Sequence, residues 1–200
     1  MTLIDEKGKS LGRTFISNIE GDALKALLEE NTIVTSSVTV RRNCLETVGN
    51  FDNSLRSSED WELWVRIACR YPFALIKEPL VFYSQHPHNT TKNWQMLEQD
   101  LHCIEQVFRA VPQKLSYLKN RTYAHTNIYL GWKALQTGYC NQAAYFRYQA
   151  IKHYSPIIFS HKFIRLNLAI ALFQIFGNNG FSRIQSLIYS IRRRVSTVKI

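Results

Sequence analysis

The chain has 200 residues, of which 46% are hydrophobic and 20% are charged, and it carries a formal net charge of +10. This length suits one domain or a domain with an appendage, and the composition excludes an intrinsically disordered chain. The four cysteines lie far apart without a CxxC pair, which excludes a cysteine-based zinc site and predicts reduced, mostly buried thiols.

The charge is divided unequally along the chain. Residues 1–105 contain 11 Lys and Arg against 15 Asp and Glu, whereas residues 106–200 contain 14 Lys and Arg and no acidic residue. We therefore expect the two parts to meet different partners, and an anionic membrane surface suits the basic part. Nucleic-acid binding is not expected, because no RNA-binding or helix-turn-helix signature accompanies the charge.

The first twelve residues are polar and charged and lack the apolar stretch of a signal peptide. This pattern predicts a cytoplasmic protein. If the basic part binds lipid, the protein would be peripheral at the cytoplasmic face of the membrane.

From residue 1 to residue 93, short extended and helical patterns alternate, which predicts a mixed α/β layer. A short helix is expected over residues 43–48, with Asn43 as its cap and Gly49 at its end. A second helix is predicted over residues 60–68, where apolar residues recur at spacings of three and four. The strands expected in this part are short: 32–35, 37–40, 73–76 and 80–83.

From Trp94 onward helical periodicity takes over, so residues 94–200 are predicted to form an all-α extension. Small residues between positions 130 and 156 follow, to within one residue, the spacing of a single tetratricopeptide-type helical hairpin. Polar side chains interrupt the most apolar stretch, residues 157–176, so it falls short of the ~20 residues that span a bilayer. Residues 181–200 predict a basic amphipathic helix.

Glu59 and Asp60 stand between a turn-forming segment and the helix predicted over residues 60–68. A helix N-terminus stabilises an ionised carboxylate, and a general base must be ionised to accept a proton. An Asp at the start of a helix is also a common N-cap without any chemical role. The acidic pair alone leaves both interpretations open.

Four ordered blocks around this pair resemble the second half of family 2 glycosyltransferases. They are Ser-Ser-Val-Thr-Val-Arg-Arg (36–42), Val-Gly-Asn-Phe-Asp (48–52), Ser-Glu-Asp-Trp-Glu-Leu-Trp-Val-Arg (58–66) and Glu-Pro-Leu-Val-Phe-Tyr-Ser-Gln-His (78–86). The resemblance covers about residues 1–95 and implies the acceptor-side half of a GT-A (Rossmann-like) domain in residues 1–93. It also implies an inverting enzyme that transfers sugar from a nucleotide-sugar donor to a carbohydrate or lipid-linked acceptor, as in polysaccharide biosynthesis.

The resemblance implies roles for three residues. Asp60 would take the proton of the acceptor hydroxyl, and Glu59 would shape the site or orient the acceptor. A divalent metal, Mg or Mn, would hold the donor diphosphate, and His86 aligns with a histidine that completes this site in many GT-A enzymes. The alternative for His86 is an ordinary loop residue, because its carboxylate partners are absent.

Two tryptophans are candidates for acceptor binding. Trp94 follows a polar loop and could serve as a platform for a sugar ring, or it could pack at the start of a helix. Trp61 could also stack on a sugar, but its helical spacing with Trp64 favours a core position. Arg41 and Arg42 could reach substrate phosphate, and a solvated pair at the entry to a helix is their default interpretation.

The chain contains no DxD motif and no Gly-rich phosphate loop, although the family resemblance implies a donor half that carries a DxD motif. Residues 3–12 resemble the strand and turn that follow the DxD strand, so we expect the chain to begin in mid-fold. The isolated chain is therefore expected to be inactive without a separate donor half. The alternative function is a non-catalytic remnant or a protein-binding helical module.

Overall fold

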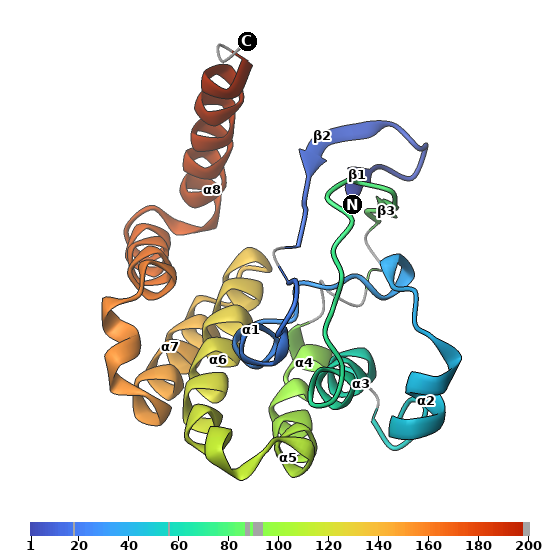
Figure 1. The fold of residues 1–200 in the computed structure, drawn as a ribbon. Helices are drawn as coiled ribbons and strands as arrows, with labels where there is room; N and C mark the ends of the chain where they lie inside the picture. The colour runs from blue at the N-terminus through green and yellow to red at the C-terminus, as the bar shows by residue number, and fades with distance from the viewer. Residues whose placement is uncertain (18, 56, 87–88, 90–93, 198–200) are drawn as a thin grey trace. The chain divides into compact units, whose positions relative to one another are not determined.

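A computed structural model describes residues 1–17, 19–55, 57–86, 89 and 94–197. The chain forms two compact units, residues 1–126 and 127–200, and the division falls inside helix α6 (Lys119–Gln136). A small sheet and most of the short helices belong to the first unit, and long helices make up the second (Figure 1). The predicted boundary after residue 93 differs from this division, because α4 and α5 belong to the first unit.

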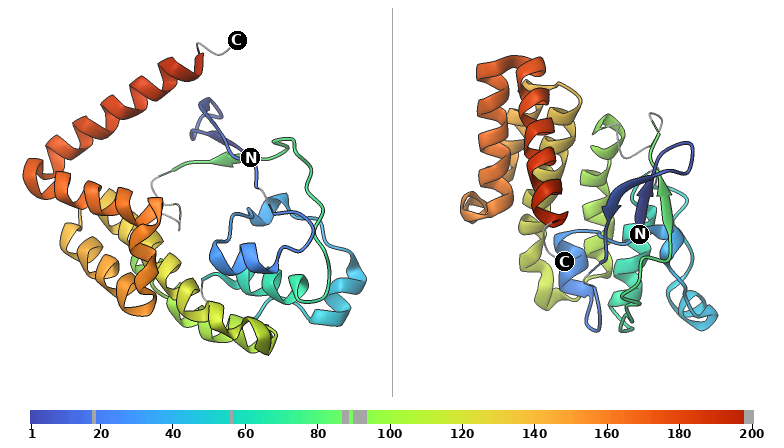
Figure 2. Two further views of the ribbon diagram at one scale, coloured as in Figure 1. Left: turned by 60° about the vertical axis from the view of Figure 1, so that its left-hand side comes forward. Right: turned by 90° about the horizontal axis from the view of Figure 1, so that it is seen from above.

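The sheet has three short strands, β1 (Thr2–Ile4), β2 (Ser10–Thr14) and β3 (Phe82–Ser84), in the order β2-β1-β3. β1 runs antiparallel to β2 and parallel to β3, as the right-hand view of Figure 2 shows. Oδ1 of Asp5 accepts hydrogen bonds from the backbone N–H groups of Lys7 and Lys9 and so stabilises the turn between β1 and β2. The strand and turn predicted in residues 3–12 and the strand predicted near residues 80–83 are therefore confirmed.

The strands predicted at 32–35 and 37–40 are wrong. This segment instead holds a 3₁₀ turn, η1 (Thr35–Ser37), flanked by irregular backbone. Val34 and Val38 have extended dihedral angles, as β-branched residues prefer, but neither belongs to a strand. The Ser37 hydroxyl donates to the Val34 carbonyl at 2.6 Å, which stabilises the turn locally.

The strand predicted at 73–76 is reduced to one isolated bridge between Phe73 and Gly21. The two backbones exchange hydrogen bonds of 2.7 and 2.9 Å across that bridge. The apolar run at 73–76 thus lacks the regular partner that a longer strand needs.

Helices α1 (Leu24–Glu29) and α5 (Asp100–Ala110) both pack against α3 (Glu59–Ala68), and the three form the core of the first unit (Figure 1). All three contribute side chains that are at most 1% exposed: Leu27, Leu28, Leu63, Val65, Cys103, Ile104 and Val107. The helix predicted at 60–68 is confirmed as α3. The mixed α/β class is also confirmed, although helices dominate the core and the sheet is small.

The remaining helices of the first unit are short. α2 (Arg42–Val48) ends where Gly49 adopts a φ of 86°, which confirms the predicted stop at this glycine. Its N-cap is Arg41, not the predicted Asn43. α4 (Trp94–Leu97) and the 3₁₀ helix η3 (Gln113–Leu118) flank α5 in the sequence.

The second unit contains the rest of α6, α7 (Cys140–His153), the 3₁₀ helix η4 (Ser155–Phe159) and α8 (His161–Thr197). The helices meet closely at Gly131, where an added Cβ would lie 2.9 Å from Leu166 Cδ2 and 3.4 Å from the Ala143 carbonyl oxygen. The predicted helices between residues 130 and 156 are therefore present as α6 and α7. Their assignment as a tetratricopeptide-type hairpin stays a prediction.

Helix α8 is divided by a kink at Gly177, whose dihedral angles of 64° and −177° are not helical. Its backbone continues to residue 197, but the side chains predicted to form a basic amphipathic face, residues 184–194, lie outside the described ones. Within the described part of the chain, no helix is both long enough and apolar enough to cross a lipid bilayer.

Candidate active site

Three donors hold the carboxylate of Asp60. The Thr35 hydroxyl donates to Oδ2 at 2.6 Å, and the Asn31 amide and the Trp61 backbone N–H donate to Oδ1 at 3.4 and 2.6 Å. Since each carboxylate oxygen can accept two hydrogen bonds, Oδ2 retains one acceptor position. Asp60 is only partly buried, so this position belongs to a fixed carboxylate that solvent can reach.

Asp60 is not the cap of α3. The helix begins at Glu59, Ser58 is its N-cap, and Asp60 is its second residue. Ser58 has a φ of 59° and a ψ of 23°, and among the described residues it is the one non-glycine with a positive φ. Such a conformation costs about 1 kcal/mol and persists where surrounding contacts hold it.

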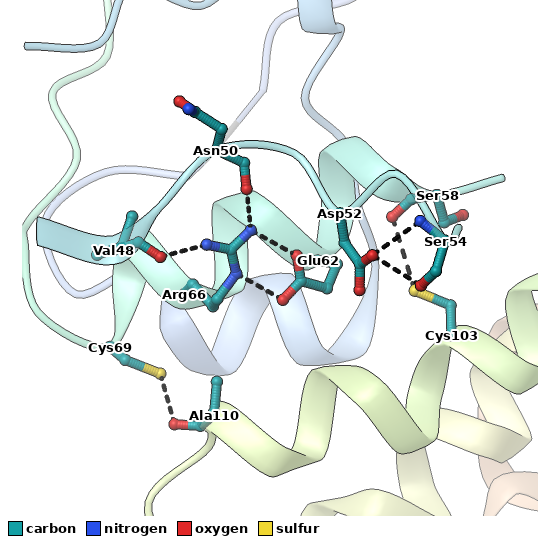
Figure 3. A network of polar contacts seen from close by, with 10 residues as sticks. All are labelled: Val48, Asn50, Asp52, Ser54, Ser58, Glu62, Arg66, Cys69, Cys103 and Ala110. Carbon is teal, nitrogen blue, oxygen red and sulfur yellow. Dashed lines mark hydrogen bonds and ion pairs between the residues drawn. The ribbon is translucent and has the colours of Figure 1, made fainter. Parts of the chain in front are cut away.

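The contacts that hold Ser58 come from two helices. Its carbonyl accepts the Glu62 backbone N–H at 3.1 Å, which is the first turn of α3. The same carbonyl accepts the buried Cys103 thiol of α5 at 3.6 Å, as Figure 3 shows. Packing of α5 on α3 therefore helps to fix the residue that precedes the acidic pair.

Glu62 and Arg66 form an ion pair within α3, and Arg66 also binds the loop after α2. Arg66 donates to both carboxylate oxygens of Glu62, at 2.6 Å from Nε and 2.8 Å from Nη2, and Glu62 is only 6% exposed. The guanidinium also donates to the carbonyls of Val48 and Asn50 (Figure 3). Arg66 thereby satisfies a buried carboxylate and closes the loop that joins two of the sequence blocks.

The same loop carries Asp52, whose carboxylate accepts the Ser54 hydroxyl at 2.7 Å and the Ser54 backbone N–H at 2.9 Å. These hydrogen bonds lower the pKa of Asp52 below its ordinary value. Phe51 packs edge-on against Trp64 with ring centroids 6.2 Å apart. Asp52 thus shapes the turn through Oδ1 alone, whereas donors from residues 31 and 35 hold both carboxylate oxygens of Asp60.

The two tryptophan candidates have different surroundings. Trp61 is 6% exposed, and its indole N–H donates to the Leu27 carbonyl at 2.8 Å. A ring enclosed in this way offers no face to a sugar, so we assign Trp61 to the core and not to acceptor binding. Trp94 begins α4 and is partly buried, which leaves both of its interpretations open.

His86 follows β3 and lies in a turn with Asn89. Its backbone N–H donates to Asn89 Oδ1 at 2.5 Å, and the Asn89 amide donates to the Ser84 carbonyl at 3.1 Å. Across the described residues, no three His, Cys, Asp or Glu side chains gather in a way that could hold a metal ion. The metal role of His86 and the divalent metal of the complete family site therefore stay predictions. The other residues of the predicted loop, 87–88 and 90–93, lie outside the described part.

Glu59 and the arginine pair lie on the surface. Glu59 is exposed in the first turn of α3, beside the fixed carboxylate of Asp60. Arg41 and Arg42 are exposed at the start of α2, and Arg42 lines an open hollow with Val40, Leu45, Glu46 and Asn50. Neither Glu59 nor Asp60 is among the residues that line this hollow.

Residues 4–134 match the model of the glycosyltransferase like family 2. The chain belongs to this family. No curated protein and no solved structure matches the chain. The family match covers β2, β3, the Asp60 site and α6 up to residue 134, and it gives the protein a function of the glycosyltransferase type.

Sequence reasoning missed the residues that hold Asp60 and Ser58. Asn31 and Thr35 precede the acidic pair by more than twenty positions, inside a segment that β-branched residues made look like a strand. Cys103 looked like an ordinary buried thiol. An Asn followed by a Thr-Ser-Ser run is typical of local turns, and this is the one signal that could have indicated η1.

Proposed function

We propose that this family 2 glycosyltransferase chain supplies the acceptor side of an inverting sugar transfer, with Asp60 as the general base. The observation that carries the proposal is the Asp60 carboxylate, fixed by three donors while Oδ2 keeps an acceptor position open to solvent. A base must be within hydrogen-bond reach of the proton that it removes, and an open acceptor position allows this.

In the proposed reaction, an acceptor hydroxyl donates a hydrogen bond to Asp60. Its oxygen attacks the anomeric carbon of the donor sugar from the face opposite the leaving group, and the proton passes to the carboxylate. The bond between the anomeric carbon and the diphosphate oxygen breaks, and the nucleoside diphosphate leaves with the electron pair. One displacement inverts the configuration at the anomeric carbon, and one base is enough for it.

Two further residues could contact the acceptor. Glu59 adjoins Asp60 on the surface and could accept a hydrogen bond from a second acceptor hydroxyl. Trp94 is partly buried and could offer part of its ring as a platform for a carbohydrate or lipid-linked acceptor. No step of the proposed reaction passes through a metal at His86.

We further propose that donor binding needs residues outside this sequence, since residues 1–200 contain no DxD motif. The net charge of +14 in residues 106–200 supports an acceptor that is presented at an anionic, cytoplasmic membrane face. The isolated chain is then expected to show neither binding nor hydrolysis of a nucleotide sugar. Metal-dependent donor hydrolysis by the purified chain would contradict this expectation.

The decisive experiment supplies a donor half of this family upstream and measures sugar transfer. Asp60→Asn should lower kcat by about a hundredfold or more, because an amide cannot accept the proton. Asp52→Asn is the matched control, since this Asp is partly buried like Asp60 and accepts its hydrogen bonds from Ser54 in a local turn. Equal transfer rates for the chain and for Asp60→Asn would remove Asp60 from the mechanism. No transfer by either protein would support the alternative, a non-catalytic remnant or a protein-binding module.

A further inference from the structure

Helix α8 is apolar on two opposite faces before its kink. One face is buried in the second unit and contains Phe163, Leu166, Ala169 and Ile170, which are at most 7% exposed. The other face, here called the outer face, consists of Ile164, Leu168 and Ile175, which are 48%, 60% and 71% exposed. Spacings of four and seven place these three side chains on one line along the helix.

Exposed aromatic rings extend the outer face at both ends. Phe159 in η4, just before α8, is 81% exposed, and Phe176, next to the kink at Gly177, is 54% exposed. Exposed apolar residues that occur singly need no explanation, but a line of large side chains along 18 residues of chain marks an interaction surface.

The charges around the outer face identify its partner. His161 and Arg165 are exposed at its border, and no acidic residue occurs between residues 106 and 200. The chain beyond the kink adds Arg183, Lys199 and a run of three arginines at 192–194. Two copies that met through the outer face would bring positive borders together with no acidic residue of 106–200 to pair them, so charge repulsion disfavours self-association through it. An anionic lipid surface satisfies both the apolar line and the positive border.

We propose that the outer face of α8 is a membrane-surface site, and that Ile164, Leu168 and Ile175 enter the acyl boundary of an anionic bilayer. The first segment of α8 then lies flat in the headgroup region, with Arg165 among the lipid phosphates. Its 16 residues, 161–176, form a helix about 24 Å long, so the three apolar side chains can contact the lipid along its length. The inference rests on the proposed function only in placing the acceptor at a membrane.

The experiment measures co-sedimentation of the full chain with vesicles of phosphatidylcholine alone and with vesicles that also contain phosphatidylglycerol. Ile164→Gln/Leu168→Gln/Ile175→Gln removes the outer face and keeps side chains that favour helix. Ile16→Gln/Ile76→Gln/Leu80→Gln is the matched control, because these residues have the same types and are 52%, 67% and 66% exposed in the first unit. Circular dichroism and thermal melting establish that both variants fold.

We expect the chain to bind the anionic vesicles more tightly than the neutral ones. The outer-face variant should lose about tenfold or more in partition coefficient, because three large apolar side chains no longer enter lipid. The control variant should stay within about twofold of the unchanged chain, because its substitutions lie outside the outer face. Part of the binding should survive salt that screens the charges, since apolar insertion is not electrostatic.

Three results would overturn the proposal: no binding to anionic vesicles, equal loss in the two variants, or binding that depends on salt but not on the outer face. A chain that dimerises through this face, becoming monomeric in the outer-face variant while vesicle binding is unchanged, would assign it to a second copy. Sugar transfer is not part of the assay. If the chain binds vesicles but shows no transfer after a donor half is supplied, only the proposed function is refuted. If it transfers sugar with that donor half but does not bind vesicles, only this inference is refuted.

Discussion

The hydroxyl of Thr35 donates a 2.6 Å hydrogen bond to Oδ2 of Asp60, although 25 positions separate the two residues. Thr35 lies in the 3₁₀ turn η1 and Asp60 in the first turn of α3. The orientation of the carboxylate therefore depends on a turn from a different part of the chain, and the irregular segment around η1 contributes to the site.

Removing the Thr35 hydroxyl should impair catalysis more than substrate binding. With a donor half supplied, we expect Thr35→Val to lower kcat by about tenfold, because a carboxylate that can rotate is less often aligned with the acceptor hydroxyl. The KM for the nucleotide sugar should not change. Steady-state kinetics with varied donor and acceptor measure both quantities.

Thr35→Ser is the matched control, because it retains the hydroxyl and should restore most of the rate. If Thr35→Val and Thr35→Ser have the same kcat as the unchanged chain, Thr35 does not position Asp60.

Arg66 should be critical for stability. Arg66→Met leaves the carboxylate of Glu62, which is 6% exposed, without its partner, and we expect a loss of about 3 kcal/mol in the free energy of unfolding. Urea denaturation followed by circular dichroism measures this loss. The carbonyls of Val48 and Asn50 also lose their donor, so the loop after α2 should become more susceptible to proteolysis.

A double variant separates the ion pair from general packing. Glu62→Leu/Arg66→Met removes both charges and should be more stable than Arg66→Met alone, because no unpaired buried charge remains. If the double variant loses as much stability as Glu62→Leu and Arg66→Met lose together, the two charges do not interact, and the pair contributes nothing through its charges.

Gly131 should tolerate no large side chain. An added Cβ lies 2.9 Å from Leu166 Cδ2, and the Ala143 carbonyl and Phe146 Cβ are within 3.6 Å. We expect Gly131→Val to destabilise the second unit by about 1–3 kcal/mol. Gly131→Ala should cost less, because alanine favours the helix and Leu166 can move.

Thermal unfolding of the variants tests the close approach at Gly131. Combining Gly131→Val with Leu166→Ala should give a loss smaller than the sum of the two single losses, since the shortened side chain leaves room for valine. A sum that is strictly additive would mean that residues 131 and 166 do not meet.

The interaction of Glu105 with α6 should make stability depend on pH in the acidic range. Hydrogen bonds from Lys119 and then Tyr123, both 2.7 Å long, lower the pKa of Glu105 below its ordinary value of 4.5. A lowered pKa in the folded state means that the contribution is present above pH 4.5 and is lost as the pH falls through the folded value.

Glu105→Gln measures this contribution. Because the side chains of Glu105 and Lys119 are 54% and 36% exposed, solvent screens the pair, and we expect a loss of only about 0.5 kcal/mol at neutral pH. The difference between the two proteins should vanish in acid. A difference that grows as the pH falls would contradict the assignment.

The parts of the fold that local patterns determine could be predicted from the sequence. The apolar spacing of α3, the glycine that ends α2 and the helical tail were all readable in this way. The segment at 32–40 was not, because β-branched residues favour extended backbone whether or not another strand is near. Only the tertiary structure determines whether such a segment finds a partner strand.

The candidate site was predictable in one residue and not in its surroundings. Asp60 followed from its place in a resembling block. Asn31 and Thr35 contact Asp60, and Cys103 contacts Ser58, through long-range hydrogen bonds that no spacing encodes. The burial of Trp61, by contrast, could be predicted from local spacing. Its helical period indicated burial, and the structure places its indole in the core with a hydrogen bond to Leu27.

The left-handed conformation of Ser58 restricts which amino acids can occupy this position. Glycine, asparagine and aspartate adopt a φ of 59° at little or no cost, whereas valine, isoleucine and proline do not. A saturation library at position 58 should therefore enrich the first group under selection for folded protein. Backbone shape, and not side-chain chemistry, would then decide which mutations are tolerated one residue before the acidic pair.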